Sequence, residues 1–250
     1  MTEAEPVVLL EKTPEGVAIL TLNRPDKHNA LSNVLMDEMS DHLLSIRDDP
    51  EVRVVVVTGA GEKAFCAGRD MNEGVSDGRA SRVERPSPMT LLVEMDKPTI
   101  AAVNGYAFGG GALLSLMCDL RYAAGSATFR FPGAAYGLAV GAGLLAQLIG
   151  PSRAKDLIFT TRVVKADEAL SLGLVNQVVD IDVKEYALGV AASIAKHSVG
   201  ALATSKRLID DTVRPTDLMK LEGAANGALR TDEQSERFKA AASAVTGRQF

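Results

Sequence analysis

Two glycine-containing loops, each placed after an apolar, strand-like run, are the features of this sequence best suited to chemistry. The first, GAGEKAFCAGRDM, spans residues 59–71, and the second, NGYAFGGGALL, spans residues 104–114. Glycine permits positive φ angles and a close approach of the backbone to a ligand. A helix that begins near Gly110 would leave N–H groups unpaired at the positive end of its dipole. Two such loops side by side would aim two N–H donors at one oxygen, which is an oxyanion hole.

Other residues that could do chemistry have weaker support. Cys66 has no histidine near it in the sequence, and we expect it and Cys118 to be packed in the core. The three histidines lack cysteine or carboxylate neighbours at ligand spacing, so no metal site is expected. GAGLLA, residues 141–146, fits a loose dinucleotide fingerprint, but it follows no clean strand and lacks the acidic residue expected after it.

The surrounding sequence predicts the elements that hold these loops. VVLLEKTPEGVAILTLNRP indicates a hairpin with its turn at residues 13–16. Helical spacing of apolar residues follows over residues 31–44, with Ser32 as the N-cap. Buried strands are predicted over residues 52–59, 98–105 and 119–125. Because helices alternate with these strands, a parallel sheet is the natural arrangement.

Two stretches depart from this alternation. The segment from Asp70 to Pro88 is polar and rich in Gly, Ser, Pro and Arg, so we expect a long mobile loop of the kind that is often functional. After Pro151 we expect the strands to stop and the remaining chain to be helical. The sequence therefore predicts an α/β core followed by a helical C-terminal part.

Composition excludes several classes of function. The 250 residues carry a net charge of −5, which argues against nucleic-acid binding. Two cysteines cannot make a disulfide framework and fit a reducing compartment. No apolar run reaches the length of a membrane span, and the acidic N-terminus has no signal-peptide or transit-peptide character. We therefore expect a cytoplasmic protein with no membrane association.

The chain resembles the crotonase superfamily, also called the enoyl-CoA hydratase/isomerase family, over essentially its whole length. The resemblance rests on LNRPDKHNAL, AFCAGRDM, KPTIAAVNGYAFGGG, CDLRYAA and FTTRVVKADEALSLGLVNQVV, with a helical tail closing near Phe250. It implies an α/β crotonase (ClpP-like) spiral of repeated ββα units over residues 1–195. Residues 196–250 would form a helical C-terminal trimerisation region. It also implies a homotrimer or a dimer of trimers that acts on acyl-CoA thioesters.

The resemblance assigns roles to residues of both loops. The oxyanion-hole donors would be the backbone N–H groups of Arg69 and Gly110. Coenzyme A would enter as part of the substrate, with no tightly bound cofactor, along residues 27–31 and 64–68, and Lys27 could meet a phosphate as a point charge. The residues expected to contact coenzyme A are Lys27, His28, Ala30, Ala64, Ala67, Gly68, Asp70 and Met71.

The family's usual proton-transfer groups are missing from this sequence. Its hydratases carry glutamates at the positions that are Leu113 and Gly133 here, and some relatives use an aspartate where this chain has Gly141. General acid–base catalysis contributes about 10²–10⁴-fold per group, so a poor water-adding enzyme is expected. Tyr136 is the first-ranked substitute, because a phenol can donate a hydrogen bond or a proton to a substrate.

Other groups and reactions remain open at this point. Asp70 and Glu73 could reach the acyl end, and Arg69 could hold a substrate carboxylate, which would suit a decarboxylase or C–C lyase. The leading interpretation is an enzyme of the enoyl-CoA hydratase/isomerase type that acts through an enolate. The alternative is a catalytically degenerate protein that binds acyl-CoA without turning it over.

Overall fold

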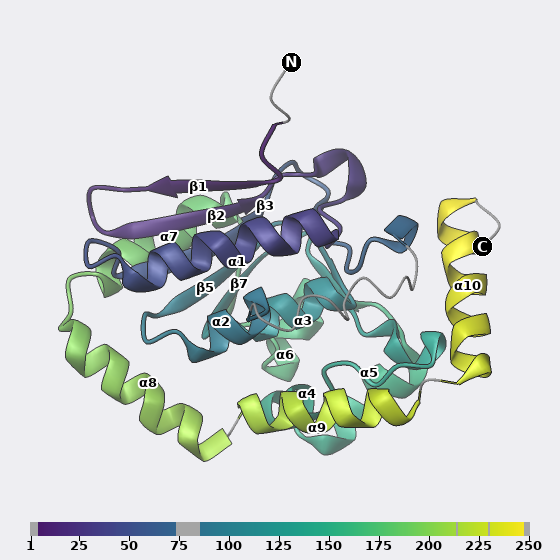
Figure 1. Ribbon diagram of the computed structural model, residues 1–250. Coiled ribbons are helices and arrows are strands. Elements are labelled where there is room, and N and C mark those ends of the chain that lie inside the picture. The colour runs from purple at the N-terminus through teal and green to yellow at the C-terminus, as the bar shows by residue number, and fades with distance from the viewer. Residues whose placement is uncertain (1–4, 74–85, 214, 230, 248–250) are drawn as a thin grey trace.

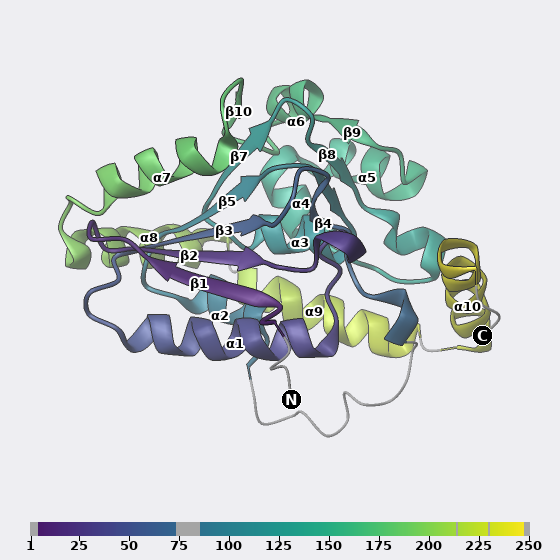
Figure 2. The same ribbon diagram turned by 90° about the horizontal axis from the view of Figure 1, so that it is seen from above.

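The computed structural model describes residues 5–73, 86–213, 215–229 and 231–247, and its first elements form the predicted hairpin. β1 (Val8–Lys12) pairs antiparallel with β2 (Val17–Leu22). The hairpin joins a six-stranded sheet in the order β1-β2-β3-β5-β7-β10 (Figures 1 and 2). The added strands, all parallel to their neighbours, are β3 (Val54–Gly59), β5 (Thr99–Val103), β7 (Leu120–Ala124) and β10 (Gln177–Val179). The predicted parallel sheet is therefore confirmed.

This sheet separates two apolar layers, because successive residues of a strand point to opposite faces. Val54 and Val56 pack with α7 (Val183–Ile194) on one face. Val55 and Val57 face the other layer, which includes the buried side of α1 (Asn33–Asp48). Figure 2 shows α1 and α7 on opposite sides of the strands. The predicted N-cap of α1 is also confirmed, since Ser32 Oγ accepts a hydrogen bond from Leu35 N at 3.1 Å.

A second sheet of short strands lies beyond the ends of β3 and β5. Its order is β4 (Ala64–Cys66), β6 (Tyr106–Phe108), β8 (Thr128–Arg130) and β9 (Val164–Lys165). The expectation that strands stop after Pro151 is wrong, because β9 and β10 both follow it. These two strands contain two and three residues, and they are held by pairing with β8 and β7 rather than by long apolar runs.

Shorter helices alternate with the strands along the chain. The α-helices are α2 (Pro88–Glu94), α3 (Gly110–Leu116), α4 (Ala142–Ile149), α5 (Pro151–Thr160) and α6 (Ala166–Leu172). The 3-10 helices are η1 (Pro25–Lys27), η2 (Met71–Glu73) and η3 (Pro132–Tyr136). Most of the loop predicted between Asp70 and Pro88 falls on residues 74–85, outside the described residues.

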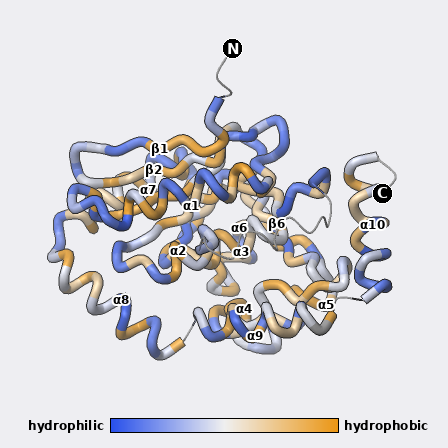
Figure 3. The backbone as a smooth tube through the Cα atoms, viewed as in Figure 1, coloured by the Kyte–Doolittle hydropathy of each residue, from blue (hydrophilic) through white to orange (hydrophobic). Residues whose placement is uncertain are grey.

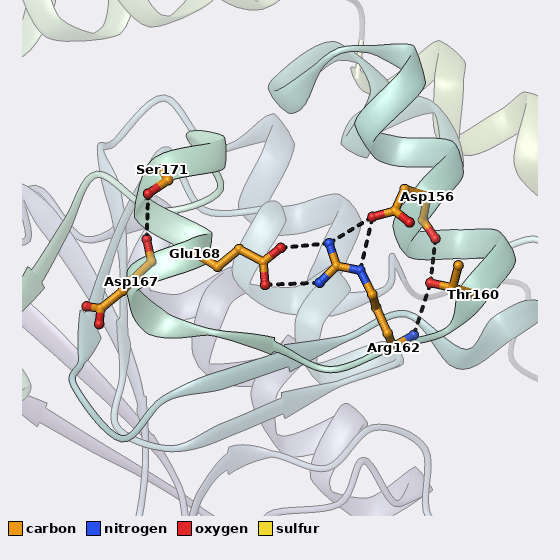
Figure 4. A network of polar contacts seen from close by, with 6 residues as sticks. All are labelled: Asp156, Thr160, Arg162, Asp167, Glu168 and Ser171. Atoms are coloured by element: carbon orange, nitrogen blue, oxygen red, sulfur yellow. Dashed lines mark hydrogen bonds and ion pairs between the residues drawn. The ribbon is translucent and has the colours of Figure 1, made fainter.

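A polar network fixes α5 against α6 at the surface (Figure 4). The Arg162 guanidinium lies 2.7 Å from an Asp156 carboxylate oxygen and 2.6 Å from a Glu168 carboxylate oxygen. All three side chains are more than a third exposed. Solvent therefore screens these pairs, and we assign the network a positioning role rather than a large share of the stability.

The C-terminal helices wrap around the edge of the core (Figure 1). They are α8 (Val199–Val213), α9 (Pro215–Ala228) and α10 (Asp232–Thr246). α9 packs on α4 and α2, whereas α10 packs on η2 and η3. Several apolar side chains of α8 stay exposed, including Leu208 and Ile209, and Figure 3 shows apolar segments along this helix. Among the helices of the described residues, none is long and apolar enough to cross a bilayer.

Candidate active site

The two glycine loops meet and bring the backbone nitrogens of Arg69 and Gly110 close together. A Cβ built on Gly110 would lie 3.6 Å from Arg69 N, and one built on Gly68 would lie 3.2 Å from Gly110 N. Neither the Arg69 N–H nor the Gly110 N–H donates a hydrogen bond to another described residue. Gly110 is the first residue of α3, where N–H groups have no partner inside the helix. Both N–H groups are therefore unpaired within the described part of the chain.

Gly68 allows this close approach of the two loops. Its φ is +94°, which lies in the region that favours glycine, and a Cβ there would come within 2.6 Å of Phe108 O. Any side chain at position 68 would thus collide with the backbone of the second loop next to the Gly110 N–H. The sequence therefore places glycine here for the close approach that the oxyanion-hole hypothesis requires.

The two segments predicted to contact coenzyme A lie side by side. Leu31 N donates to Gly68 O at 2.7 Å, Asp70 N donates to Leu31 O at 3.1 Å, and Ala67 N donates to His28 O at 3.0 Å. Leu31 and Arg69 form a parallel bridge at the centre of this contact. Lys27 and His28 are exposed, Ala30 and Ala67 are half-buried, and Ala64 is buried in β4. Met71 begins η2 directly after this ladder.

The Arg24 side chain contacts both strands of this ladder. One guanidinium nitrogen donates to Ala30 O at 2.7 Å, and another lies 2.9 Å from an Asp70 carboxylate oxygen. Burial raises the pKa of the Asp70 carboxyl, but hydrogen bonds from Asn72 and the charge of Arg24 outweigh burial, so its pKa lies below its usual value. Asp70 is thus a buried ion-pair partner, and its carboxylate is already engaged.

Glu73, the second loop acid, is also engaged. Its carboxylate accepts a hydrogen bond from Asn33 N at 2.8 Å, at the start of α1. That position compensates the positive end of the α1 dipole. The structure therefore gives both Asp70 and Glu73 structural partners near the site.

The three positions that lack the family's usual proton-transfer groups are Leu113, Gly133 and Gly141, and Leu113 and Gly141 lie close together. Leu113 lies one helical turn after Gly110 on α3, and its Cδ1 would be 3.7 Å from a Cβ on Gly141. A Cβ on Gly133 would lie 2.8 Å from Leu138 O and 3.2 Å from Val140 Cβ. The backbone around Gly133 thus has no room for a side chain without a shift. This wall of the site is apolar at all three positions.

Tyr136 lies on the segment that borders this wall. It is the last residue of η3, it is half-buried, and η3 begins at Pro132, which adjoins Gly109. α10 packs against both η3 and η2, so one helix covers the elements that carry Tyr136 and Met71.

Cys66 and Cys118 behave as core residues, as predicted. Both are buried, and burial raises the pKa of each thiol to about 12. The reactive form of cysteine is the thiolate, so neither is suited to act as a nucleophile near neutral pH. Cys66 also lies directly against Gly111. A Cβ built on Gly111 would lie 2.0 Å from Cys66 O.

Two residues near the site received no role from the sequence. Arg24 belongs to the LNRP motif, but nothing local shows that its partner is 46 positions away in the other loop. Glu222, on α9, accepts a hydrogen bond from Gly141 N at 2.6 Å across a separation of 81 residues. Only contacts between distant segments reveal either one, since each occurs in an ordinary polar context.

Comparison with known proteins identifies the family. The family model described as enoyl-CoA hydratase/isomerase matches residues 12–245. The short-chain-enoyl-CoA hydratase of Clostridium acetobutylicum is 41% identical over 212 residues, covering 81% of this chain and 80% of that protein. The crotonyl-CoA hydratase of Syntrophomonas wolfei is 36% identical over 245 residues, covering 93% and 94%.

A solved structure extends this similarity to the fold. The enoyl-CoA hydratase of Bacillus anthracis superposes with a TM-score of 0.77 at 34% identity, covering 97% of each chain. The predicted crotonase fold is thereby confirmed. With a family match across nearly all of its length, this chain belongs to the enoyl-CoA hydratase/isomerase family.

Proposed function

We propose that this protein binds an acyl-CoA thioester and stabilises its enolate between the Arg69 and Gly110 N–H groups. The observation that carries the proposal is the close approach of these two N–H donors, which have no partner among the described residues. An oxyanion-hole donor is worth about 10²–10³-fold in rate, so two donors can support enolate formation. The relatives named as hydratases of enoyl-CoA substrates support this substrate class.

Efficient hydration of a short enoyl-CoA is not the reaction we assign. Leu113, Gly133 and Gly141 place no titratable group on the wall beside the hole. Adding water across a double bond needs one group to activate the water and one to protonate carbon. Tyr136 is our proposed hydrogen-bond or proton donor, supported by its half-buried place on η3. Double-bond isomerisation, decarboxylation and C–C cleavage remain the competing reactions at this site.

The remaining assignments follow from the same arrangement. Lys27, His28 and Ala30, with Ala64, Ala67 and Gly68, would hold coenzyme A along the ladder between residues 28–31 and 67–70. Met71 and the Asp70 backbone would border it. We also propose residues 1–195 as the substrate-binding core and residues 196–250 as the part that makes subunit contacts in a trimer or dimer of trimers. A cytoplasmic location is consistent with the substrate class.

A second candidate function has one observation in its favour. The apolar character of Leu113 and the two glycines is what a protein would show if it bound acyl-CoA without catalysing a reaction. In such a protein the oxyanion hole would serve recognition of the thioester carbonyl alone.

Turnover and binding of crotonyl-CoA by the purified protein separate these functions. We expect binding, with hydration at least about 10²-fold slower than a hydratase that carries both carboxylates achieves. Loss of the conjugated thioester absorbance reports turnover, and calorimetry reports binding in parallel. Rapid hydration would show that another group supplies the acid–base chemistry, whereas no binding of any acyl-CoA would contradict the proposed substrate class.

A further inference from the structure

One face of α9 contacts the segment that carries Gly141, and we call the contacts of Leu218, Glu222 and Asn226 with residues 139–143 the latch. Asn226 accepts from Ala139 N at 2.8 Å and donates to Ala139 O at 2.6 Å. One turn earlier, Glu222 Oε1 accepts from Gly141 N at 2.6 Å. One turn earlier again, Leu218 packs where a Cβ on Gly143 would lie, 3.0 Å away. Because residues four apart share one helix face, a single face of α9 fixes residues 139–143.

This latch brings a carboxylate to the wall that otherwise lacks one. Gly141 is buried, and a Cβ on it would meet Leu113 Cδ1 at 3.7 Å and Phe131 Cδ1 at 3.8 Å. Leu113 in turn lies one helical turn from Gly110, whose N–H borders the oxyanion hole. The Glu222 carboxylate, bonded to Gly141 N, therefore lies at the segment that supplies the third of these apolar positions.

The surroundings of Glu222 disfavour the charged form of its carboxyl. Burial raises the pKa of its carboxyl, and hydrogen bonds from the Gly141, Ala142 and Gly143 N–H groups only partly offset burial. No titratable side chain occurs on α4, and the only one on α2 is Glu94, its last residue. On α9 itself Asp217 and Lys220 lie off the latched face, and within the described part of the chain Glu222 forms no ion pair.

We propose that Glu222 is the base that removes the proton from the carbon next to the thioester carbonyl. The inference rests on the proposed function, because it needs an acyl-CoA in the oxyanion hole. The C–H bond breaks, its proton passes to a Glu222 carboxylate oxygen, and its electron pair forms the carbon–carbon double bond of the enolate. The carbonyl π electrons move to the thioester oxygen, which the Arg69 and Gly110 N–H groups hold. The reverse step returns a proton to carbon and restores the thioester.

Hydrogen exchange of butyryl-CoA in deuterated water tests this step. Butyryl-CoA is saturated, so exchange at the carbon beside the carbonyl reports proton removal alone. We expect the wild type to exchange the hydrogen at this position. Glu222→Gln should lower the exchange rate by at least about 10²-fold. The glutamine keeps an oxygen that can accept from Gly141 N, so the latch is preserved while the base is removed. Asn226→Ala, which removes the neighbouring latch contact and no carboxyl group, is the matched control and should keep most of the exchange.

The pH profile gives a readout that a purely structural role would not produce. Only the deprotonated carboxylate accepts a proton, so wild-type exchange should fall as the pH drops through a pKa above the usual value for glutamate. Glu222→Gln should lack this limb, and Asn226→Ala should retain it.

The outcomes separate this inference from the function on which it rests. Unchanged exchange in Glu222→Gln, or butyryl-CoA binding by a wild type that does not exchange, would overturn the role of Glu222 and leave thioester binding intact. Equal loss of exchange and of binding in Glu222→Gln and Asn226→Ala would show a structural latch only. A wild type that binds no acyl-CoA would overturn the proposed function and this inference together.

Discussion

Gly110→Pro should lower turnover or hydrogen exchange of a bound acyl-CoA by about 10²–10³-fold, because it deletes one of the two oxyanion donors. Proline is tolerated at the first position of a helix, which is where Gly110 lies in α3. The helix should therefore remain intact while the N–H disappears. The effect is expected mainly in the rate constant, since the donor acts most strongly on the developing negative charge. Steady-state kinetics or exchange rates measure it.

Gly110→Ala is the matched control for this change. Either replacement adds a Cβ that would lie 3.1 Å from Leu31 Cδ1, the end of a side chain that can move by a few tenths of an ångström. Alanine keeps the N–H, so its activity should stay close to that of the wild type. If alanine and proline reduce the rate equally, crowding against Leu31 explains the loss and the donor does not.

Arg24→Met should destabilise the fold by about 3 kcal/mol and weaken binding of coenzyme A. The change leaves the Asp70 carboxylate, whose side chain is 6% exposed, without its cationic partner. It also removes the donor to Ala30 O, so the ladder between residues 28–31 and 67–70 loses its brace. Urea denaturation reports the free energy of unfolding, and calorimetry with coenzyme A reports binding.

The stability difference should depend on pH in a defined direction. The pKa of the Asp70 carboxyl is lowered in the folded protein, so the ion pair stabilises the wild type above the unfolded pKa of about 3.9. That stabilisation is lost as the pH falls through the lower folded pKa, and the gap between wild type and variant should narrow there.

Arg47→Met is the control for this ion pair. Arg47 pairs with Asp48 at 2.9 Å, but both side chains are at least half exposed, and the change should cost well under 1 kcal/mol. A similar small cost for Arg24→Met would contradict the bracing role of the buried pair.

Local patterns in the sequence predicted much of the scaffold. The Pro-Gly turn between two apolar runs indicated the β1–β2 hairpin, and the valine run indicated the doubly buried β3. Ser32 before a helical pattern marked the start of α1. The two glycine loops were expected to lie side by side, and they meet at Arg69 N and Gly110 N, because loops after neighbouring parallel strands end at the same edge of a sheet.

Features set by contacts between distant segments could not be predicted in this way. β9 and β10 are too short to show a period, and pairing with β8 and β7 defines them. Asp70 looked like a free loop acid until the structure placed Arg24 against it. The latch of Glu222 on Gly141 joins residues 81 positions apart, and no spacing rule connects them.

A crystal structure with bound butyryl-CoA tests the central claim most directly. Our account predicts that the thioester oxygen lies about 2.7–3.1 Å from both Arg69 N and Gly110 N, with the coenzyme A moiety along residues 27–31 and 64–68. A bound thioester whose oxygen lies beyond hydrogen-bonding distance of both nitrogens, or a ligand seated away from the two glycine loops, would contradict it.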